Sequence, residues 1–310
     1  MKVLVTGGAG FIGRWVVKRL LLDMVDVWVL DDLSNGSKGN LSEFAVDSNY
    51  HGLTVGDVAD MKCMENLFEN KYDICIHAAA QINVQESLDN PEKSFQTNVL
   101  GTHNVLKNAA KFDTKVVIIG TCMVYDVGQA EGITEQSPVK PASPYAGSKL
   151  AAEDLALSYH YGLGLPVVVL RPFNTYGPFQ KMNMEGGVVA IFIRNKIEGK
   201  KLKIFGDGEQ TRDLLYVEDC ADFITKAAFS DKAAGELINA GSGRDITINK
   251  LASLICPDKN GIEHVQHHHP QSEIQKLLCN NTKVKRLLNW EPEIALEEGI
   301  QRTEEWIRSL

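Results

Sequence analysis

The stretch Thr6-Gly7-Gly8-Ala9-Gly10-Phe11-Ile12-Gly13 decides the fold. It follows a short apolar run, Lys2–Val5, and leads into a helical pattern over Phe11–Leu22. Glycines at positions 7, 10 and 13 permit a tight turn, a close approach of the backbone to a pyrophosphate, and close packing of a helix on a strand. A helix N-terminus also favours negative charge, because its first N–H groups are unpaired. This order of strand, glycine turn and helix predicts a dinucleotide-binding unit.

Short runs rich in Val and Ile alternate with helical patterns through the first half of the chain. Strands are expected at Lys2–Val5, Val25–Leu30, Leu53–Val55, Ile74–His77, Val116–Ile119 and Val167–Leu170. Helices are expected at Phe11–Leu22, Met61–Asn70, Pro91–Ala110 and Pro144–Tyr161. Such alternation with right-handed crossovers predicts an α/β fold with a doubly wound parallel sheet, the Rossmann arrangement.

The pattern changes after Arg171, where Gly and Pro cluster. The expected elements are a helix at Val188–Glu198, a strand at Lys203–Phe205, a helix at Val217–Phe229, a strand at Leu237–Asn239, and then short helices from Ile246 to Leu310 around a strand near Leu277–Cys279. We therefore predict a Rossmann domain over residues 1–171 plus about 213–241. A smaller, discontinuous α+β substrate-binding lobe is expected over about 172–212 plus 242–310.

Composition excludes several classes of protein. The 310 residues are 44% apolar and 23% charged, which is ordinary globular usage, and 32 basic against 40 acidic residues give a formal charge of −8. An acidic chain lacks the excess of positive charge that is typical of general nucleic-acid and membrane-surface binders. No apolar run approaches the ~20 residues that a membrane-spanning helix needs. Six scattered cysteines are typical of reduced thiols in a cytoplasmic protein. The run His267-His268-His269 is expected to be solvated, so no metal is predicted.

A carboxylate at Asp31 indicates which dinucleotide binds. It lies 18 residues beyond Gly13, at the end of the second predicted strand. There it can accept from both ribose hydroxyls and would repel a 2′-phosphate, so NAD is favoured over NADP. The pair Asp57-Val58 is placed to hold the adenine, and Ala78-Ala79-Ala80 is small enough to let the cofactor lie over the sheet edge.

A second constellation lies at Ser143-Pro144-Tyr145-Ala146-Gly147-Ser148-Lys149. Ser143 is expected to cap a helix with Pro144 in its first turn. Tyr145 and Lys149 are spaced i, i+4 and share a helical face. We expect the ammonium, together with a cationic nicotinamide ring, to lower the pKa of the phenol toward neutrality. Tyr145 would then serve as a general acid and base for an alcohol.

Taken together, these residues resemble the extended short-chain dehydrogenase/reductase family, in its NAD-dependent nucleotide-sugar epimerase and dehydratase branch. The resemblance covers nearly the whole chain. It rests on Thr6–Gly13, Asp31-Asp32-Leu33-Ser34-Asn35, His77-Ala78-Ala79-Ala80, Asn98, Thr121 before Val124-Tyr125, Tyr145 with Lys149, Arg171-Pro172-Phe173-Asn174, and Gly206-Asp207-Gly208 through Arg212-Asp213.

The resemblance implies roles for individual residues. Thr121 would hydrogen-bond the sugar oxygen, Tyr145 would accept the proton, and Lys149 would bind the nicotinamide ribose. Cofactor-binding residues are expected at Gly7, Gly10, Phe11, Ile12, Gly13, Asp31, Asp32, Asn35, Asp57, Val58, Ala78, Ala79, Ala80, Asn98, Tyr145 and Lys149. Substrate-binding residues are expected at Thr121, Asn174, Val188, Phe205, Arg212 and Glu273, with Asn174 near the sugar diphosphate and Arg212 paired with it.

Alternatives stay open for three of these residues. Thr121 could serve only as a cap at the end of a strand. Arg212 could form a surface ion pair with Asp213 or Glu218. Asn98 could brace the backbone inside the sheet rather than contact a ligand.

Enzymes of this branch catalyse several reactions that pass through a 4-keto sugar intermediate. Met123 helps to decide which of these reactions this chain catalyses. Dehydratases of the family usually carry Asp-Glu directly after the Thr, and decarboxylases keep a Glu two residues after it, whereas this chain has Thr121-Cys122-Met123. Met123 exchanges no proton, so the usual base for C5 is missing. We therefore predict a nucleotide-sugar 4-epimerase of the UDP-hexose type that recycles its NAD.

Two other functions are kept. A 4,6- or 5,6-dehydratase is supported by the stretch Arg171–Pro178, which looks more like those subgroups, and by Cys122, a conceivable proton donor although more simply a small buried filler. A non-catalytic protein that binds NAD and a nucleotide sugar would not require the set of Thr121, Tyr145 and Lys149. The resemblance also implies a homodimer through the helices at Pro91–Ala110 and Pro144–Tyr161.

Overall fold

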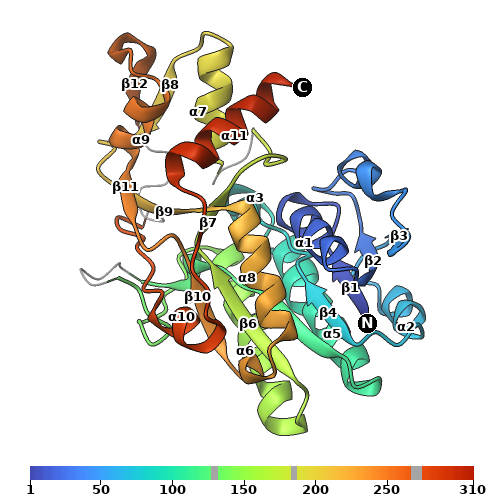
Figure 1. The fold of residues 1–310 in the computed structure, drawn as a ribbon. Coiled ribbons are helices and arrows are strands. Elements are labelled where there is room, and N and C mark those ends of the chain that lie inside the picture. The colour runs from blue at the N-terminus through green and yellow to red at the C-terminus, as the bar shows by residue number, and fades with distance from the viewer. Residues whose placement is uncertain (127–131, 183–186, 267–273) are drawn as a thin grey trace.

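The computed structural model describes residues 1–126, 132–182, 187–266 and 274–310 (Figure 1). A seven-stranded sheet forms its centre, in the order β10-β6-β5-β4-β1-β2-β3, with every neighbouring pair parallel. Its strands are β1 (Lys2–Thr6), β2 (Asp26–Asp31), β3 (Tyr50–Val55), β4 (Ile74–His77), β5 (Lys115–Ile119), β6 (Val167–Pro172) and β10 (Leu237–Ala240). The predicted doubly wound parallel α/β sheet is confirmed.

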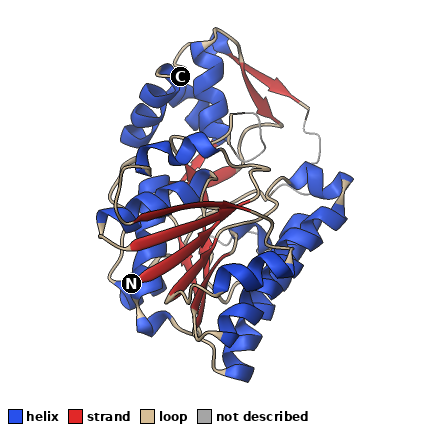
Figure 2. Cartoon of the chain, turned by 90° about the vertical axis from the view of Figure 1, so that its right-hand side faces the viewer, coloured by secondary structure: helices blue, strands red, loops and turns tan. Residues whose placement is uncertain are grey.

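Helices cover both faces of this sheet, as Figure 2 shows. The apolar side chains of α1 (Phe11–Leu22) and α8 (Val217–Phe229) form one core with one face. Those of α2 (Met61–Phe68), α5 (Gly101–Lys111) and α6 (Pro144–Leu163) form a second core with the other face. Burial on both sides explains why the strands read as nearly continuous Val and Ile runs.

The order of strands places a switch point beside β1. The chain winds outward from β1 to β3 and then returns to add β4 on the other side of β1. In open α/β sheets, ligands bind outside the carboxyl ends of the strands at such a point. The glycine turn after β1 and the alanines after β4 meet here.

The predicted helix at Pro91–Ala110 is present but irregular. It consists of α4 (Pro91–Ser94), a π-helical turn η2 (Phe95–Leu100) and α5, and α3 (Val84–Asp89) precedes it. Asn98 lies in the π-helical turn, so its expected place inside the sheet is wrong. Its buried side chain hydrogen-bonds to the backbone of Gln81, accepting from Gln81 N at 2.8 Å and donating to Gln81 O at 3.0 Å. π-Helical turns of this kind are frequent at functional sites.

A second group of elements packs above the carboxyl ends of the sheet (Figure 1). The strands β7 (Asn174–Tyr176), β9 (Thr211–Tyr216) and β11 (Asp245–Thr247) form a mixed sheet, and β8 (Leu202–Phe205) pairs in parallel with β12 (Ile262–Val265). The helices α7 (Val188–Ile197), α9 (Ile248–Ile255) and α11 (Leu296–Arg308) share a separate apolar core with these strands. The helix α10 (Thr282–Leu288) lies against β10.

The predicted strand near Leu277–Cys279 is wrong. The segment makes only isolated bridges, between Ile133 and Cys279 and between Thr211 and Lys276. The physical reason is that the Cys279 amide donates to the Asp213 carboxylate at 3.0 Å instead of to a neighbouring strand. The sequence reasoning also missed β12.

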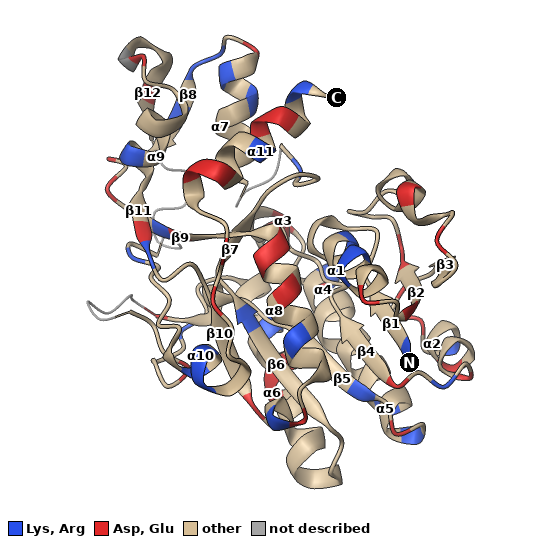
Figure 3. Ribbon diagram, in the orientation of Figure 1, with Lys and Arg blue, Asp and Glu red and all other residues tan. Residues whose placement is uncertain are grey.

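Several global features follow from the side chains. Basic and acidic residues are interspersed over both groups of elements (Figure 3). All six cysteines are unpaired. Within the described ranges, no helix has both the length and the apolar character that crossing a bilayer demands.

Candidate active site

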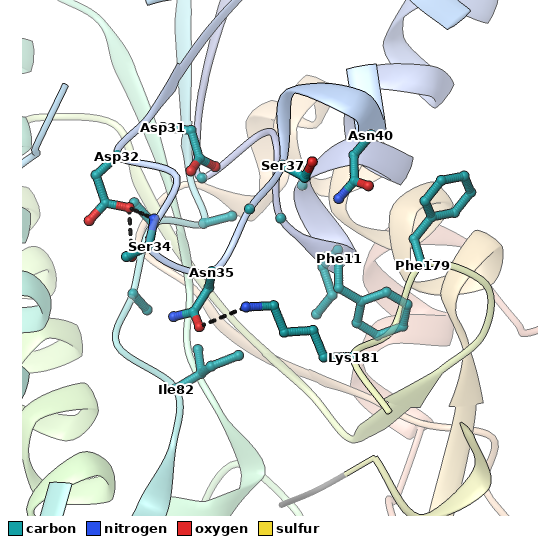
Figure 4. A pocket seen from close by; sticks show the side chains of 18 of the residues that line it. Phe11, Asp31, Asp32, Ser34, Asn35, Ser37, Asn40, Ile82, Phe179 and Lys181 are labelled. Atoms are coloured by element: carbon teal, nitrogen blue, oxygen red, sulfur yellow. Dashed lines mark hydrogen bonds between the residues drawn. The ribbon is translucent and has the colours of Figure 1, made fainter. Parts of the chain in front are cut away.

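A pocket of about 650 Å³ opens at the switch point, between the sheet and the second group of elements. Figure 4 shows side chains from both groups pointing into it. Of the predicted cofactor-binding residues, those that line it are Gly7, Gly10, Phe11, Ile12, Gly13, Asp31, Asp32, Asn35, Asp57, Val58, Ala78, Ala79 and Ala80.

The glycine turn has the geometry that the sequence predicted. Gly7 has a φ of 72°, and a Cβ at this position would lie 2.6 Å from the Ala79 amide nitrogen. A Cβ at Gly13 would overlap the Gly7 carbonyl, so only glycine lets α1 approach the turn this closely. Gly10 caps α1 without any side-chain hydrogen bond, which leaves the first N–H groups of the helix open to an anion. These residues fit the pyrophosphate of a dinucleotide.

Asp31 lies at the end of β2 with its carboxylate held in place. Its Oδ2 accepts from the Ala9 amide at 2.9 Å and its Oδ1 from the Leu33 amide at 2.8 Å. Burial raises the pKa of this carboxyl, and the backbone hydrogen bonds oppose that rise. Asp32 instead turns toward its own loop, where its Oδ1 accepts from the Ser34 amide at 2.9 Å (Figure 4).

The opposite wall of the pocket includes residues 179–182, which follow β7, and sequence reasoning missed them. Lys181 reaches across and donates from Nζ to Asn35 Oδ1 at 3.4 Å (Figure 4). Phe179, with a φ of 71°, lies 3.7 Å from the buried Arg14 guanidinium, measured from its ring centroid to Cζ. The Trp15 indole donates to Pro178 O at 3.0 Å. No local sequence motif predicts these contacts, because they join residues more than 140 positions apart.

The predicted catalytic residues lie together between β5 and α6. Ser143 caps α6 by accepting from the Ala146 amide, and Tyr145 follows in its first turn. The Thr121 side chain acts on the Tyr145 phenol and favours its phenolate form. Lys149 lies one turn further, and its Nζ donates to Ile119 O at 2.6 Å. Thr121 also accepts from the Met123 amide at 3.2 Å, so it caps a short 3₁₀ turn as well.

The expected lowering of the Tyr145 pKa relies on the nicotinamide charge as well as on Lys149, and it stays a prediction. Burial raises the pKa of Tyr145 to about 12, and the Thr121 side chain offsets only part of that rise. Burial also lowers the pKa of Lys149 to about 8. Both groups are buried, and the ammonium is committed to the Ile119 carbonyl rather than to the phenol. Desolvation is therefore the largest influence on the pKa of each of the two side chains.

Cys122 and Met123 follow Thr121 without supplying an acid or base. Cys122 is buried in an apolar cluster with Val124 and Phe173, and burial raises the pKa of its thiol to about 12. Met123 packs against the same cluster. The description of Cys122 as a small buried filler fits this environment.

The predicted substrate residues are spread over the second group of elements. Asn174 begins β7, and its buried Oδ1 has no hydrogen-bond partner among the residues that the structure describes. Arg212 lies in β9 and donates from Nη1 to Thr211 O at 2.7 Å and to Ile274 O at 2.8 Å. Val188 begins α7, and Phe205 ends β8 with 39% of its surface exposed.

Some predicted positions do not reach the pocket or cannot be placed. Asn98, Thr121, Tyr145 and Lys149 lie outside the residues that line it. Glu273 and His267 to His269 lie outside the described residues. Within the described part of the chain, no cluster of three or more His, Cys, Asp or Glu side chains is arranged to hold a metal ion.

Fold and site together define a Rossmann-type dinucleotide-binding protein with a Thr–Tyr–Lys group beside its pocket. The chain belongs to the NAD dependent epimerase/dehydratase family, whose model matches residues 3–241. The cofactor is therefore NAD.

Individual proteins similar to this chain carry the names of more than one activity of the family. The chain is 36% identical to a UDP-glucose 4-epimerase of Mycolicibacterium smegmatis over 100% of this chain and 99% of that relative. It is 32% identical to a dTDP-glucose 4,6-dehydratase of Streptomyces niveus over 99% of this chain and 93% of the relative. The X-ray structure of Pal from Bacillus thuringiensis is similar with a TM-score of 0.98 and 59% identity, covering 100% of this chain and 99% of that one. The chain is thus an enzyme of the epimerase/dehydratase type.

Proposed function

We propose that this protein is an NAD-dependent nucleotide-sugar 4-epimerase that acts on a UDP-hexose. Two observations support the proposal. Thr121, which follows β5, acts on the phenol of Tyr145 at the start of α6 and favours its phenolate form. Cys122 and Met123, instead of two carboxylates, come directly after Thr121. Thr121, Tyr145 and Lys149 together support the oxidation of an alcohol. The two residues after Thr121 supply no acid or base that would support the elimination of water.

The roles of the residues follow from their chemistry. Tyr145 removes the proton of the sugar 4-hydroxyl and later returns it, while Thr121 hydrogen-bonds the same oxygen. NAD, when bound, supplies the hydride acceptor and donor together with a positive charge that favours the phenolate. Lys149 adds a second positive charge and a donor for a ribose hydroxyl. Inversion at C4 would require the 4-keto sugar to rotate before the hydride is returned to it.

A dehydratase would need an acid for the 6-hydroxyl and a base for the C5 proton. Met123 exchanges no proton at any pH. Cys122 is 3% exposed, and with the pKa of its thiol near 12 it is a poor base at neutral pH. These facts favour the epimerase over the dehydratase, although relatives of both kinds exist.

Features of the second group of elements support a nucleotide sugar as substrate. The unpartnered Asn174 Oδ1 is a buried acceptor without a protein donor among the described residues, which suits a ligand hydroxyl or N–H. Arg212 lies in β9, on the same small sheet, and a guanidinium suits a diphosphate. We take this group as the substrate lobe, predicted at residues about 172–212 plus 242–310, and the Rossmann domain as 1–171 plus about 213–241. The strand β9, which pairs with β7 and β11 up to Tyr216, supports a first boundary a few residues later. The cytoplasmic location remains a prediction.

We also propose a homodimer through the helices that begin at Pro91 and Pro144. Exposed apolar side chains on them support this assembly, since Phe95 is 52% exposed, Tyr161 74% and Leu163 68%. Light scattering on a sizing column tests the proposal, with the mass of two chains expected. A single-chain mass at micromolar concentration would contradict it.

A panel of substrates tests the proposed reaction. The NAD-loaded protein is incubated with UDP-glucose, UDP-N-acetylglucosamine, UDP-glucuronate and dTDP-glucose, and the products are examined by NMR and mass spectrometry. An unchanged mass with inversion at C4 is expected for at least one UDP-sugar. Loss of one water would identify a dehydratase instead. Tight NAD binding without turnover of any sugar would favour a non-catalytic binding protein.

A further inference from the structure

A buried ion pair lies beneath the Thr–Tyr–Lys group. Arg171 in β6 donates from Nε and Nη2 to Glu153 Oε2 at 2.9 and 2.6 Å. The side chains are 3% and 1% exposed. Such a pair is poor evidence for stability, because desolvation of both charges offsets their attraction and an apolar pair of similar volume often does as well. Its position suggests another use.

Glu153 shares a face of α6 with the two reactive residues. It lies one turn beyond Lys149 and two turns beyond Tyr145. Its carboxylate is packed against Gly120, where a Cβ would overlap Oε1. Burial raises the pKa of this carboxyl, and the charges of Arg171 and Lys149 oppose that rise and favour the anion. One carboxylate therefore contacts the strand end that presents Thr121 and also faces Lys149.

Arg171 is fixed from the far side. Its guanidinium lies 4.7 Å from the centroid of the Tyr125 ring, measured from Cζ, and the Tyr125 hydroxyl donates to Asn239 Oδ1 in β10 at 2.8 Å. The backbone N–H of Asn239 donates to Glu135 Oε1 at 2.9 Å. This chain of contacts leaves the Glu153 carboxylate little freedom to turn away from Gly120.

The charges around Lys149 make Glu153 important for it. Among the described residues, the charged or titratable groups that act on this ammonium are Glu153 on α6 and His77 at the end of β4. His77 is neutral at ordinary pH because burial and the Lys149 charge lower its pKa to about 3. Burial lowers the pKa of Lys149 to about 8, and the Glu153 charge opposes that fall. Lys149 thus has a single compensating anion among these groups.

We propose that Glu153, clamped by Arg171, is a positioning residue that keeps Lys149 protonated and holds the end of β5 so that the Thr121 and Tyr145 hydroxyls meet on one substrate oxygen. This inference rests on the proposed function, because it assigns Lys149 and Tyr145 their roles in C4 oxidation. Glu153 touches neither substrate nor cofactor in this scheme.

The first test compares Glu153→Gln with Asp154→Asn, which neutralises the exposed neighbouring carboxylate on the same helix. Both are assayed as NAD-loaded proteins for turnover against pH. Since Lys149 must be protonated, activity falls as pH rises through its pKa. Loss of the Glu153 charge lowers that pKa, so the alkaline limb of Glu153→Gln should move down by about one pH unit. Asp154→Asn should leave the limb in place. An unmoved limb in Glu153→Gln would overturn the proposal.

A second variant separates electrostatics from stability. Glu153→Gln alone leaves the Arg171 charge buried without its partner, which destabilises the fold. The double variant Glu153→Gln/Arg171→Gln removes both charges and should recover part of the lost melting temperature, yet its alkaline limb should remain shifted. A limb that returns to its original position together with the stability would mean that the pair is merely structural.

A third readout does not depend on turnover. NMR of protein labelled with ¹⁵N-lysine, with Lys149→Arg to assign the signal, follows the titration of the Lys149 ammonium in the NAD-loaded protein. A lower pKa in Glu153→Gln than in Asp154→Asn supports the inference even if no sugar in the panel is converted. Equal pKa values would refute it while leaving the epimerase proposal untouched.

Discussion

The Lys149 ammonium donates to the Ile119 carbonyl oxygen at 2.6 Å, which ties α6 to the carboxyl end of β5. This contact holds a charge inside the protein, next to the Tyr145 phenol one helical turn away. The pKa of Lys149 is lowered to about 8 by burial, so the charge on this residue changes within an accessible pH range.

Turnover is therefore expected to fall as pH rises through about 8, where Lys149 loses its proton. Lys149→Arg keeps a positive charge at every accessible pH, because guanidinium has a pKa above ~12. Its rate should be reduced by the altered geometry, and its alkaline limb near pH 8 should be absent. The measurement is kcat against pH for both proteins. An identical limb in the variant would show that another group is responsible.

Tyr145→Phe removes the proposed acid and base with almost no change in volume. Turnover should fall by roughly 10²–10⁴-fold, the usual contribution of general acid–base catalysis. NAD binding should persist, since the glycine turn and Asp31 are untouched. Steady-state assays and titration with the dinucleotide check the two expectations. Near-normal turnover would refute the assignment of Tyr145.

Asp31→Ala removes the carboxylate at the end of β2. We expect weaker binding of NAD, because the proposed bonds to both ribose hydroxyls are lost, and less discrimination against NADP, because a repelling charge is gone. The Ala9 and Leu33 amides also lose their acceptor, so the turn itself should loosen. Calorimetric titrations with NAD and NADP give the ratio of their dissociation constants. An unchanged ratio counts against the ribose contact.

Gly120→Ala should destabilise the protein. The new Cβ would overlap the Glu153 carboxylate and lie 3.1 Å from Leu170 O, so the free energy of unfolding should drop by about 1–3 kcal/mol. Gly162→Ala is the matched control, because it lies in the same helix as Glu153 with nothing within 4 Å of the added atom. It should be stabilising by up to ~1 kcal/mol. The free energy of unfolding of both variants is measured from denaturant unfolding curves. Equal changes in the two variants would contradict the packing of Glu153 against Gly120.

Local motifs explain how much of this protein could be predicted. The glycines of the first turn, Asp31 at the end of β2, and Ser143 at the start of α6 act through neighbours in the chain, so spacing alone indicates their positions. The helix and strand order of the sheet follows from apolar periodicity for the same reason.

Long-range contacts and the burial of side chains limit what could be predicted from the sequence. Phe179 meets Arg14, and Arg171 meets Glu153, through tertiary packing that no local pattern encodes. The pKa of Tyr145 depends on how deeply the phenol is buried, which spacing to Lys149 does not reveal. The apolar segment around Leu277 resembles a strand in composition, yet an acidic side chain takes the hydrogen bond that a neighbouring strand would have made.

Deuterium at C4 of the sugar tests the central claim most directly. UDP-glucose and UDP-N-acetylglucosamine, each labelled at C4, are turned over by the NAD-loaded protein, and the product is read by NMR. Oxidation and reduction at one carbon by a retained cofactor predict that the label stays on C4 of the inverted sugar and slows turnover by a primary isotope effect. Loss of the label to solvent would contradict the account. Turnover of the labelled sugar at the same rate as the unlabelled sugar would contradict it as well.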